Sequence, residues 1–563
     1  MPTELDDEKK IDDVEVFTHD VPAITARTGY VTYSTHRGLR MRHLQLIAIS
    51  GAIGSSVFLS IGNPLTGGPL PLLIGVSLWA SVVWALSNCL LEMCTLLPLD
   101  GGFIHFATRF LDPAMGFSLG WNYFICQAAL ICSELTALYV IVAYWAPDLN
   151  PAILISVGLA LLFFVQVFNV RIYGETEFWI SIGKVFMIIG VFIFTFITML
   201  GGNPIHDRYG FRYWKHPGPF AATDATGRAY AIWKALQWGA YGIVGPDYIS
   251  LVAGEVKNPR RILPKAFNST IYRIITFYVG GAFFAGLQVA SDNPDLLGAS
   301  GSGAVKSPYI INMTRLHVPI LPSIISAGLL ISLFSSTSSM AFAASRTLYG
   351  LGLQGHAPKI VTRVNRQGLP YVCVLITIAL GTLSYMALGT GSKKGEPSSV
   401  ARAVYQADIT VLNWLINLTA ATQLITWMAI AGSYIRFRAG MKAQGISRDI
   451  LPAKSRFQPW SAWYGLFWAL FALVFSGYYF FAPGSFDVPD FLFTYGAVFI
   501  FIALFIVWKI KGVRHHEQLL GIPTNDMDFK TGLQEIEEMT LQAEEEWATQ
   551  KRNVLDRVVD KLF

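Results

Sequence analysis

Charged residues are scarce in this chain. Asp, Glu, Lys and Arg make up 14% of its 563 residues, 53% are hydrophobic, and the mean hydropathy is +0.46. A soluble protein carries about 25% charged residues, so this composition argues against a soluble globular fold. The charges also gather in short segments between apolar runs that are long enough to cross a bilayer, at roughly 20 residues each. We therefore expect an all-α polytopic membrane protein.

Cysteine is scarce too, and its placement limits the chemistry. The sequence holds five cysteines, and each lies within an apolar run: Cys89, Cys94, Cys126, Cys132 and Cys373. We expect no disulfide framework and no zinc site or other metal site from this placement. The five side chains are expected to be buried small hydrophobes.

Motifs for covalent chemistry and for nucleotide binding are missing. No nucleophile motif and no phosphate loop of the form GxxxxGK[ST] occurs. We therefore expect no enzyme, no cofactor and no nucleic-acid partner. A cleavable signal peptide is not expected either, because residues 1–35 are polar and include the charged cluster Asp6 to Glu15. This segment is predicted to be a disordered tail.

The apolar runs predict twelve transmembrane helices. They cover roughly 44–63, 70–97, 113–145, 152–170, 177–200, 229–253, 269–290, 317–349, 370–389, 410–435, 459–482 and 491–510. The last segment, Thr531 to Phe563, has helical spacing of apolar residues among acids and bases. It predicts an amphipathic helix that either docks on the membrane core or lies at the lipid headgroups.

The distribution of Lys and Arg predicts the orientation. Segments on the side of the termini carry Arg37, Arg40, Arg42, Lys257, Arg260, Arg261, Lys265, Lys359, Arg363 and Arg366, with six more between Arg436 and Arg456. The opposite loops carry fewer, mostly in 201–228 and 391–409. Cytoplasmic loops are enriched in Lys and Arg, so both termini are predicted to be cytoplasmic.

Two of the predicted spans are interrupted. The first contains "GAIGSS" (Gly51 to Ser56), and the sixth contains Gly245-Pro246-Asp247. Interrupted spans at matching positions of two halves indicate a transporter built from inverted repeats, with the substrate site at the breaks. Unwound backbone is tolerated inside a membrane only where it lines a cavity or is buried in protein. The alternative is an ordinary kink, since Gly and Pro are common in membrane helices.

Few ionisable residues lie within the apolar runs, and each costs desolvation energy. Glu92 is expected either to form a structural ion pair or to act in gating. Glu134 is a candidate for contact with substrate or with a proton. Lys184 is a candidate proton switch, with snorkelling to the interface as the alternative. Asp247 lies at the second break, where it either has a role in transport or forms a local cap of the helix.

Many fragments together resemble the fungal amino-acid permeases of the amino acid–polyamine–organocation superfamily. The fragments are "RMRHLQLIAISGAIGSSVF", "GGFIHFATRFLDPAMGFSLGWNY", "SELTA", "VRIYGETEFWISIGKV", "HDRYGFRYWKHPGPF", "AGEVKNPRRILPKAF", "ASRTLYGLGLQGHAPKI" and "VLNWLINLT". The resemblance implies a five-plus-five inverted-repeat core followed by two further helices, and proton-driven uptake of amino acids at the plasma membrane. It divides the chain into a cytoplasmic tail (1–43), two repeats (44–228 and 229–437), helices 11–12 (438–511) and a second cytoplasmic tail (512–563).

The resemblance also implies a substrate site. The carboxylate of the amino acid would meet backbone N–H groups of Gly51, Ala52, Ile53, Gly54, Ser55 and Ser56, where a half-helix offers donors to an anion. The ammonium group would meet carbonyls near Ala52, Tyr241 and Val244. Selectivity is expected from Glu134, Tyr248, Trp414 and Asn417, together with Asp247. Proton coupling is expected from Lys184, Asp247 and Glu134.

This sequence departs from the family pattern at both breaks. Many relatives have glycine where Ser56 stands, so the pocket is either tighter here or gains a hydroxyl donor. Many also have Gly-Thr-Glu where this chain has Gly-Pro-Asp, which retracts the carboxylate of Asp247 by one methylene. Lys9 and Lys10 are candidate acceptors for ubiquitin, which would make ubiquitin-ligase adaptors partners of the tails, with membrane lipid surrounding the spans.

Three alternatives to amino acid import remain open from the sequence. One is a receptor-like permease that senses amino acids without net transport. Another is a transporter of a related amine, such as choline or γ-aminobutyrate. The third is a membrane enzyme, which lacks supporting residues in the sequence and would predict that the substrate is chemically altered. Uptake of labelled amino acids distinguishes the receptor-like permease from a transporter, because a pure sensor binds its ligand without accumulating it.

Overall fold

The computed structural model describes residues 54, 56–99, 101–142, 145–146, 149–167, 170–243, 245–256, 258–297, 307–365, 368–388, 397–481, 486–513 and 521–549. All of them belong to one of two compact units, which spans Ser34–Phe563. The described residues form helices and no strand.

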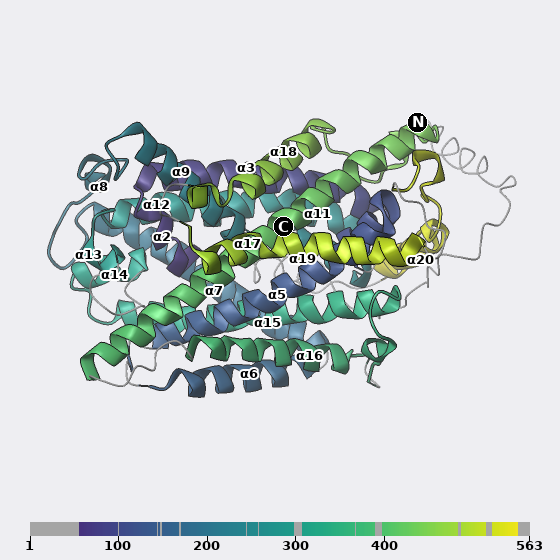
Figure 1. The fold of residues 1–563 in the computed structure, drawn as a ribbon. Coiled ribbons are helices and arrows are strands. Elements are labelled where there is room, and N and C mark those ends of the chain that lie inside the picture. The colour runs from purple at the N-terminus through teal and green to yellow at the C-terminus, as the bar shows by residue number, and fades with distance from the viewer. Residues whose placement is uncertain are drawn as a thin grey trace, which may run out of the picture. The chain divides into compact units, whose positions relative to one another are not determined.

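Long helices make up most of the fold (Figure 1). They are α3 (Pro69–Leu96), α5 (Pro113–Val142), α6 (Pro151–Val167), α7 (Val170–Met199), α9 (Ala225–Gly242), α11 (Pro259–Arg273), α12 (Gly280–Gln288), α15 (Leu321–Leu353), α16 (Tyr371–Gly381), α17 (Pro397–Ala443), α18 (Trp460–Phe475), α19 (Val488–Val513) and α20 (Leu533–Thr549). Shorter helical pieces connect them: η3 (Ser56–Ser60), α2 (Gly62–Leu65), α4 (Gly102–Phe106), η4 (Ala107–Leu111), α8 (Arg212–Lys215), α10 (Pro246–Leu251), η6 (Ile274–Val279), α13 (Pro294–Leu297) and α14 (Pro308–Arg315).

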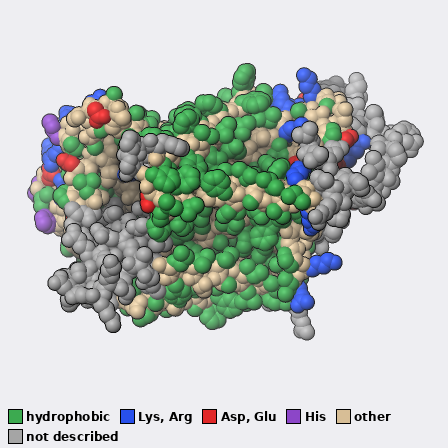
Figure 2. Space-filling view, viewed as in Figure 1, with side chains coloured by type: hydrophobic (Ala, Val, Ile, Leu, Met, Phe, Trp, Pro, Cys, Tyr) green, Lys and Arg blue, Asp and Glu red, His purple; other side chains and the backbone are tan. Residues whose placement is uncertain are grey.

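Seven stretches of helix in the described part of the chain are long and apolar enough to cross a membrane: Pro69–Leu96, Pro113–Tyr139, Gly174–Met199, Pro259–Gln288, Leu321–Leu353, Trp414–Ala443 and Val488–Lys511. Four shorter apolar helices accompany them: Ser56–Leu65, Pro151–Val167, Tyr371–Met386 and Trp460–Phe475. Figure 2 shows hydrophobic side chains covering the middle of one face, with Lys, Arg, Asp and Glu gathered toward its two ends. The chain is therefore a multi-pass helical membrane protein.

The sixth predicted span consists of two helices. Helix α9 ends at Gly242, Ile243 adopts extended backbone, and α10 begins with Pro246. Proline suits the first position of a helix because its missing N–H would have no intrahelical partner there. The interruption expected from Gly-Pro-Asp therefore separates two helices. Of the interruption predicted for the first span at Gly51 to Ser56, only Gly54 and Ser56 lie in the described part of the chain.

Helix α5 lies at the centre of the packing. It contacts α15, α17, α19, α6 and α16, and α15 in turn contacts α7 (Figure 1). All five cysteines are buried and free, as the sequence predicted. The closely packed centre is what brings side chains from α5, α7 and α15 next to the first break.

Glu92 forms a structural ion pair, which was one of its two predicted roles. Its carboxylate is paired with Arg448 and accepts hydrogen bonds from the Tyr434 hydroxyl (2.5 Å) and the Ser455 backbone N–H (2.8 Å). These three groups follow α17 or lie near its end, so Glu92 fastens α3 to the segment after α17. The pair also holds the pKa of Arg448 above its ordinary value.

The C-terminal helix α20 is docked, which was one of the two alternatives for this segment. Ile536 is buried, and the carboxylate of Glu537 lies 3.5 Å from the guanidinium of Arg260 in α11. Residues of the predicted amphipathic helix beyond Thr549 lie outside the described part of the chain.

Candidate functional site

Gly54 is the point where the first break meets two other helices. A Cβ atom at this glycine would lie 3.0 Å from Oε1 of Glu134 in α5 and 3.0 Å from Oγ of Ser336 in α15. Both distances are shorter than most contacts of a real Cβ atom, so a side chain here would have to displace its neighbours. Glycine at position 54 thus permits close approach of the broken helix to a carboxylate and a hydroxyl.

Lys184 reaches the same place from α7. It is 3% exposed, and its Nζ donates a hydrogen bond to Oγ of Ser336 at 3.4 Å. Glu134 is 2% exposed, and its carboxylate interacts electrostatically with the ammonium of Lys184. A charge within a membrane span costs roughly 2.5–3.5 kcal/mol on insertion scales. The structure offsets this cost by gathering opposite charges, and it gives no support for snorkelling because the ammonium points to a buried hydroxyl.

Glu177 is a second carboxylate near Lys184, and the sequence argument missed it. It is 2% exposed and accepts a hydrogen bond from Oγ of Ser335 at 2.5 Å. Its charge also acts on Lys184. The signal was present, because Glu177 and Lys184 are seven residues apart and therefore share one face of a helix. The predicted start of the fifth span at residue 177 had placed Glu177 at the membrane boundary.

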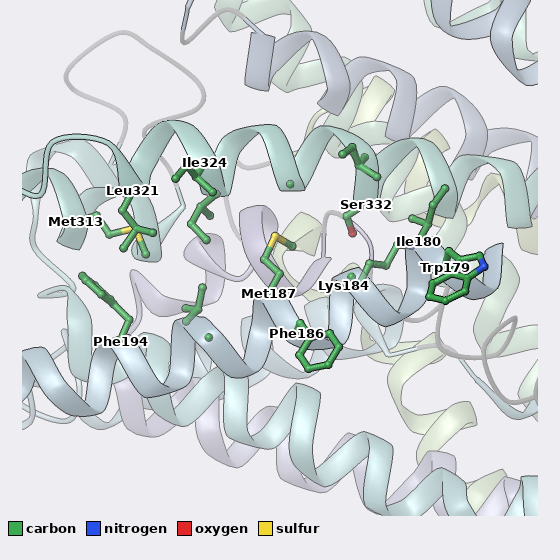
Figure 3. A pocket seen from close by; sticks show the side chains of 16 residues that line it. Trp179, Ile180, Lys184, Phe186, Met187, Phe194, Met313, Leu321, Ile324 and Ser332 are labelled. Atoms are coloured by element: carbon green, nitrogen blue, oxygen red, sulfur yellow. The ribbon is translucent and has the colours of Figure 1, made fainter. Parts of the chain in front are cut away.

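A groove of about 740 Å³ runs between α7 and α15 (Figure 3). Apart from Lys184 and Ser332, it is lined by apolar side chains and glycines. Trp179, Phe186 and Ile324 on its walls are each more than half exposed. Such a surface suits lipid and not a zwitterion, and Lys184 is the residue that the groove shares with the polar cluster around Ser336.

The second break carries its own polar network. Asp247 is fully buried at the start of α10, where its carboxylate accepts hydrogen bonds from the Tyr123 hydroxyl (3.0 Å) and the Gly245 backbone N–H (3.4 Å). The next residue, Tyr248, donates its hydroxyl hydrogen to Oε1 of Gln127 at 2.6 Å. Tyr123 and Gln127 lie one turn apart on α5 and were not among the residues selected from the sequence. The Gly245 contact is local to the break, and the Tyr123 contact ties the break to α5.

Helix η3 of the first predicted span lies beside α9 of the sixth. A Cβ atom at Gly242 would lie 3.4 Å from Cβ of Ser56, and the indole N–H of Trp238 donates to Oγ of Ser60 at 3.0 Å. Ser56 and Tyr241 are both buried next to this crossing. Helix η3 thus packs against the last turns of α9, which ends at Gly242 just before the second break.

Not every predicted site residue joins the contacts that Glu134, Lys184 and Ser336 make near Gly54. The indole N–H of Trp414 donates to Asp490 at 2.6 Å, and its ring stacks on Phe493, so Trp414 faces α19. Asn417 is half-buried on α17. The remaining predicted residues lie outside the described part of the chain: Gly51, Ala52, Ile53, Ser55 and Val244. Within the described part, no three His, Cys, Asp or Glu side chains form a group that could hold a metal ion.

A span interrupted inside a multi-pass bundle, with buried charges nearby, is typical of the transporter class of membrane protein. The chain belongs to the amino acid permease family, because the model of the family described as "Amino acid permease" matches residues 43–520. It is 38% identical to a proline-specific permease of Emericella nidulans over 93% of each chain. It is 36% identical to a general amino acid permease of Saccharomyces cerevisiae, over 90% of this chain and 84% of the relative.

A solved structure supports the fold alone. A variant of a manganese transporter from Eremococcus coleocola superposes with a TM-score of 0.50 at 14% identity, over 86% of this chain and 98% of that one.

Proposed function

We propose that this protein is a proton-coupled amino acid symporter that imports its substrate across the plasma membrane by alternating access. The observation that carries the proposal is the convergence of Gly54, Glu134 and Lys184 beside the first break. An unwound backbone next to titratable groups lets one site hold a zwitterion and a proton together. No covalent bond of the substrate changes in this process.

The substrate would lie between the two breaks. Backbone N–H groups of Gly51 to Ser56 would bind its carboxylate, since the N-terminal end of a half-helix carries unpaired donors and positive dipole. Carbonyls near Tyr241 and Val244 would bind its ammonium group. The crossing of Ser56 with Gly242 supports this arrangement, because it brings the two interrupted segments within van der Waals distance of each other.

Twelve spans in a five-plus-five repeat fit the observed helices. In this proposal η3 with α2 is the outer half of span one, α9 and α10 are the two halves of span six, and the other apolar helices supply the remainder. Asp247 would couple movement of α10 to α5 through Tyr123. The charged ends seen in Figure 2 are consistent with a bundle that crosses the membrane.

We propose amino acids as the substrate class, and proline is the first amino acid to test. The relative from Emericella nidulans is named a proline-specific permease, and another relative at 33% identity from Saccharomyces cerevisiae carries the same name. Competition of all common amino acids against labelled proline would define the range. If proline is not taken up, direct uptake of each labelled amino acid identifies the substrate, and binding without any accumulation would favour the sensor.

Lys184→Ala tests the coupling role directly. We expect the variant to lose accumulation of substrate against a gradient while it retains binding, because the ammonium that balances the carboxylate charge beside it, and on which proton coupling is proposed to depend, is gone. Accumulation ratios are measured in cells that lack their own permeases, with surface expression quantified in parallel.

The matched control is Lys215→Ala, which removes an exposed lysine in α8. This control should accumulate substrate as the wild type does. Undiminished accumulation by Lys184→Ala would overturn the proton role of Lys184.

A further inference from the structure

Glu177 is a buried carboxylate of α7 to which the proposed coupling mechanism gives no task. At 2% exposure inside an apolar span, an ionised carboxylate is costly and needs specific compensation. A glutamine of nearly the same shape would avoid the cost of the charge, so a glutamate at this position indicates that the charge has a role. The residues around Glu177 indicate which group its charge acts on.

Glu177 and Lys184 lie on the same face of α7. Residues seven apart on a helix share a face and are separated by about 10.5 Å along the axis, at 1.5 Å per residue. Helical side chains tilt toward the N-terminus, which is the direction of Glu177 from Lys184. Ser181 lies between them on the same face and is fully buried. Glu177, Ser181 and Lys184 thus form a buried polar stripe on one face of α7, and the charge of Glu177 acts on Lys184.

Helix α15 holds both groups from the opposite side. Ser335 donates to Oε2 of Glu177 at 2.5 Å, and the next residue, Ser336, accepts from Nζ of Lys184 at 3.4 Å. Two consecutive hydroxyls therefore fix the carboxylate and the ammonium in register with each other. Glu134 of α5 is the other carboxylate whose charge acts on Lys184.

These three groups have a simple charge balance. With Glu177, Glu134 and Lys184 all ionised, the cluster carries two negative charges and one positive charge. A net charge is unfavourable in a low-dielectric interior, whereas the addition of one proton to a carboxylate makes the cluster neutral. The proton comes from water and leaves to water, and no other bond changes.

We propose that Glu177 is a positioning residue for proton coupling: it neutralises Lys184, so that the cluster needs one transported proton to become neutral. This inference rests on the proposed symport of protons and amino acids. The role proposed for Glu177 accounts for the buried carboxylate in α7. It also accounts for the adjacent hydroxyls of Ser335 and Ser336, with which α15 contacts Glu177 and Lys184. It also predicts what happens when the charge is removed without changing the shape.

Glu177→Gln leaves one ammonium and one carboxylate, which are neutral together without an added proton. We expect the variant to transport substrate down its gradient within threefold of the wild-type rate. Its accumulation ratio should fall toward 1, its uptake should lose dependence on external pH, and its proton uptake should disappear. Glu177→Asp keeps the charge and should keep the pH dependence at a lower rate.

The experiment uses the full-length protein in liposomes with an internal pH indicator, and labelled proline or the amino acid that the competition panel identifies. Wild-type protein is measured first. If substrate entry by the wild type carries no proton, the proposed symport fails. If the wild type carries protons and Glu177→Gln does the same with an unchanged pH profile, the symport stands and the role of Glu177 is overturned.

Two further variants keep the test informative if Glu177→Gln folds poorly. Ser335→Ala removes only the hydroxyl that holds Glu177, and we expect a weaker pH dependence in the same direction as for Glu177→Gln. Glu175→Gln removes a half-buried carboxylate of the same helix and should change neither the accumulation ratio nor the pH profile. An equal loss of rate at every pH in Ser335→Ala, with a normal accumulation ratio, would show a purely structural role and overturn the proposal.

Discussion

At the scale of single residues, the surroundings of Gly54 predict the effect of a substitution there. A methyl group there would lie 3.0 Å from both the carboxylate of Glu134 and the hydroxyl of Ser336. In Gly54→Ala these two side chains must therefore give way by a few tenths of an ångström, and overpacking of this kind costs about 1–3 kcal/mol. We expect uptake to fall at least tenfold with normal amounts of protein at the cell surface.

The control for this variant is Gly350→Ala in α15, where an added Cβ would meet no atom within 4 Å. Gly350→Ala should transport normally. Normal uptake by Gly54→Ala would show that the first break has room for a side chain and would weaken its proposed role as the carboxylate site.

The residues selected from the sequence were those whose type is unusual for a membrane span. Lys184, Glu134 and Asp247 could be selected in this way because a charge in an apolar run is conspicuous. Tyr123 and Gln127 could not, because Tyr and Gln are unremarkable on a helix until α10 packs against it. Tyr123 is 124 residues from Asp247 in sequence, and only tertiary packing makes them partners.

At the scale of elements, the segment before α20 is fixed against the short helix η4. Asp528 forms an ion pair with the buried guanidinium of Arg109 at 3.0 Å, and Arg109 also donates to the backbone oxygens of Asp528 and Thr531. The ring of Phe529 stacks on Phe110 and lies 5.5 Å from the ring of Phe437 in α17. Helices η4, α17 and α20 are thereby joined at one end of the bundle.

Asp528→Asn should loosen this junction. Hydrogen bonds to charged groups contribute about 1.5–3 kcal/mol, and the variant leaves the Arg109 guanidinium without its carboxylate. We expect residues 521–549 to become sensitive to limited proteolysis in the purified protein, with a lower Tm. Asp526→Asn, an exposed carboxylate two residues earlier, should leave proteolysis unchanged, and equal resistance of both variants would contradict the role of the ion pair.

The pH dependence of this junction has a defined sign. Desolvation raises the pKa of Asp528, but the Arg109 charge and hydrogen bonds from Thr531 and Lys530 outweigh it, so the net pKa is lowered from 3.8. A carboxylate with a lowered pKa stabilises the docked state fully above its ordinary pKa. The contribution is lost as the pH falls through the lowered value, so docking in the wild type should persist across the neutral range.

The elements themselves were largely predictable, whereas their ends and their docking were not. Apolar length alone located α3, α5, α15 and α19, because the bilayer sets the length of a span. The break between α9 and α10 was predictable because proline cannot continue a helix. The docking of α20 was left open, since an amphipathic face fits a protein surface and a lipid surface equally well.

At the scale of the whole molecule, the balance of Lys and Arg predicts which ends of the helices face the cytoplasm. Figure 2 shows Lys and Arg concentrated toward one end of the visible face. The described helix ends that carry them include the start of α11, with Arg260 and Arg261, and the end of α17, with Arg436 and Lys442. The loop between α7 and α9 should then face outward.

This orientation can be tested without removing native cysteines, because all five are buried and should not react with a membrane-impermeant maleimide. Thr223→Cys places an exposed thiol before α9, and Ala443→Cys places one at the exposed end of α17. In intact cells we expect Thr223→Cys to be labelled and Ala443→Cys to be labelled only after permeabilisation. The reverse pattern would invert the orientation, and with it the direction in which the proposed proton gradient drives transport.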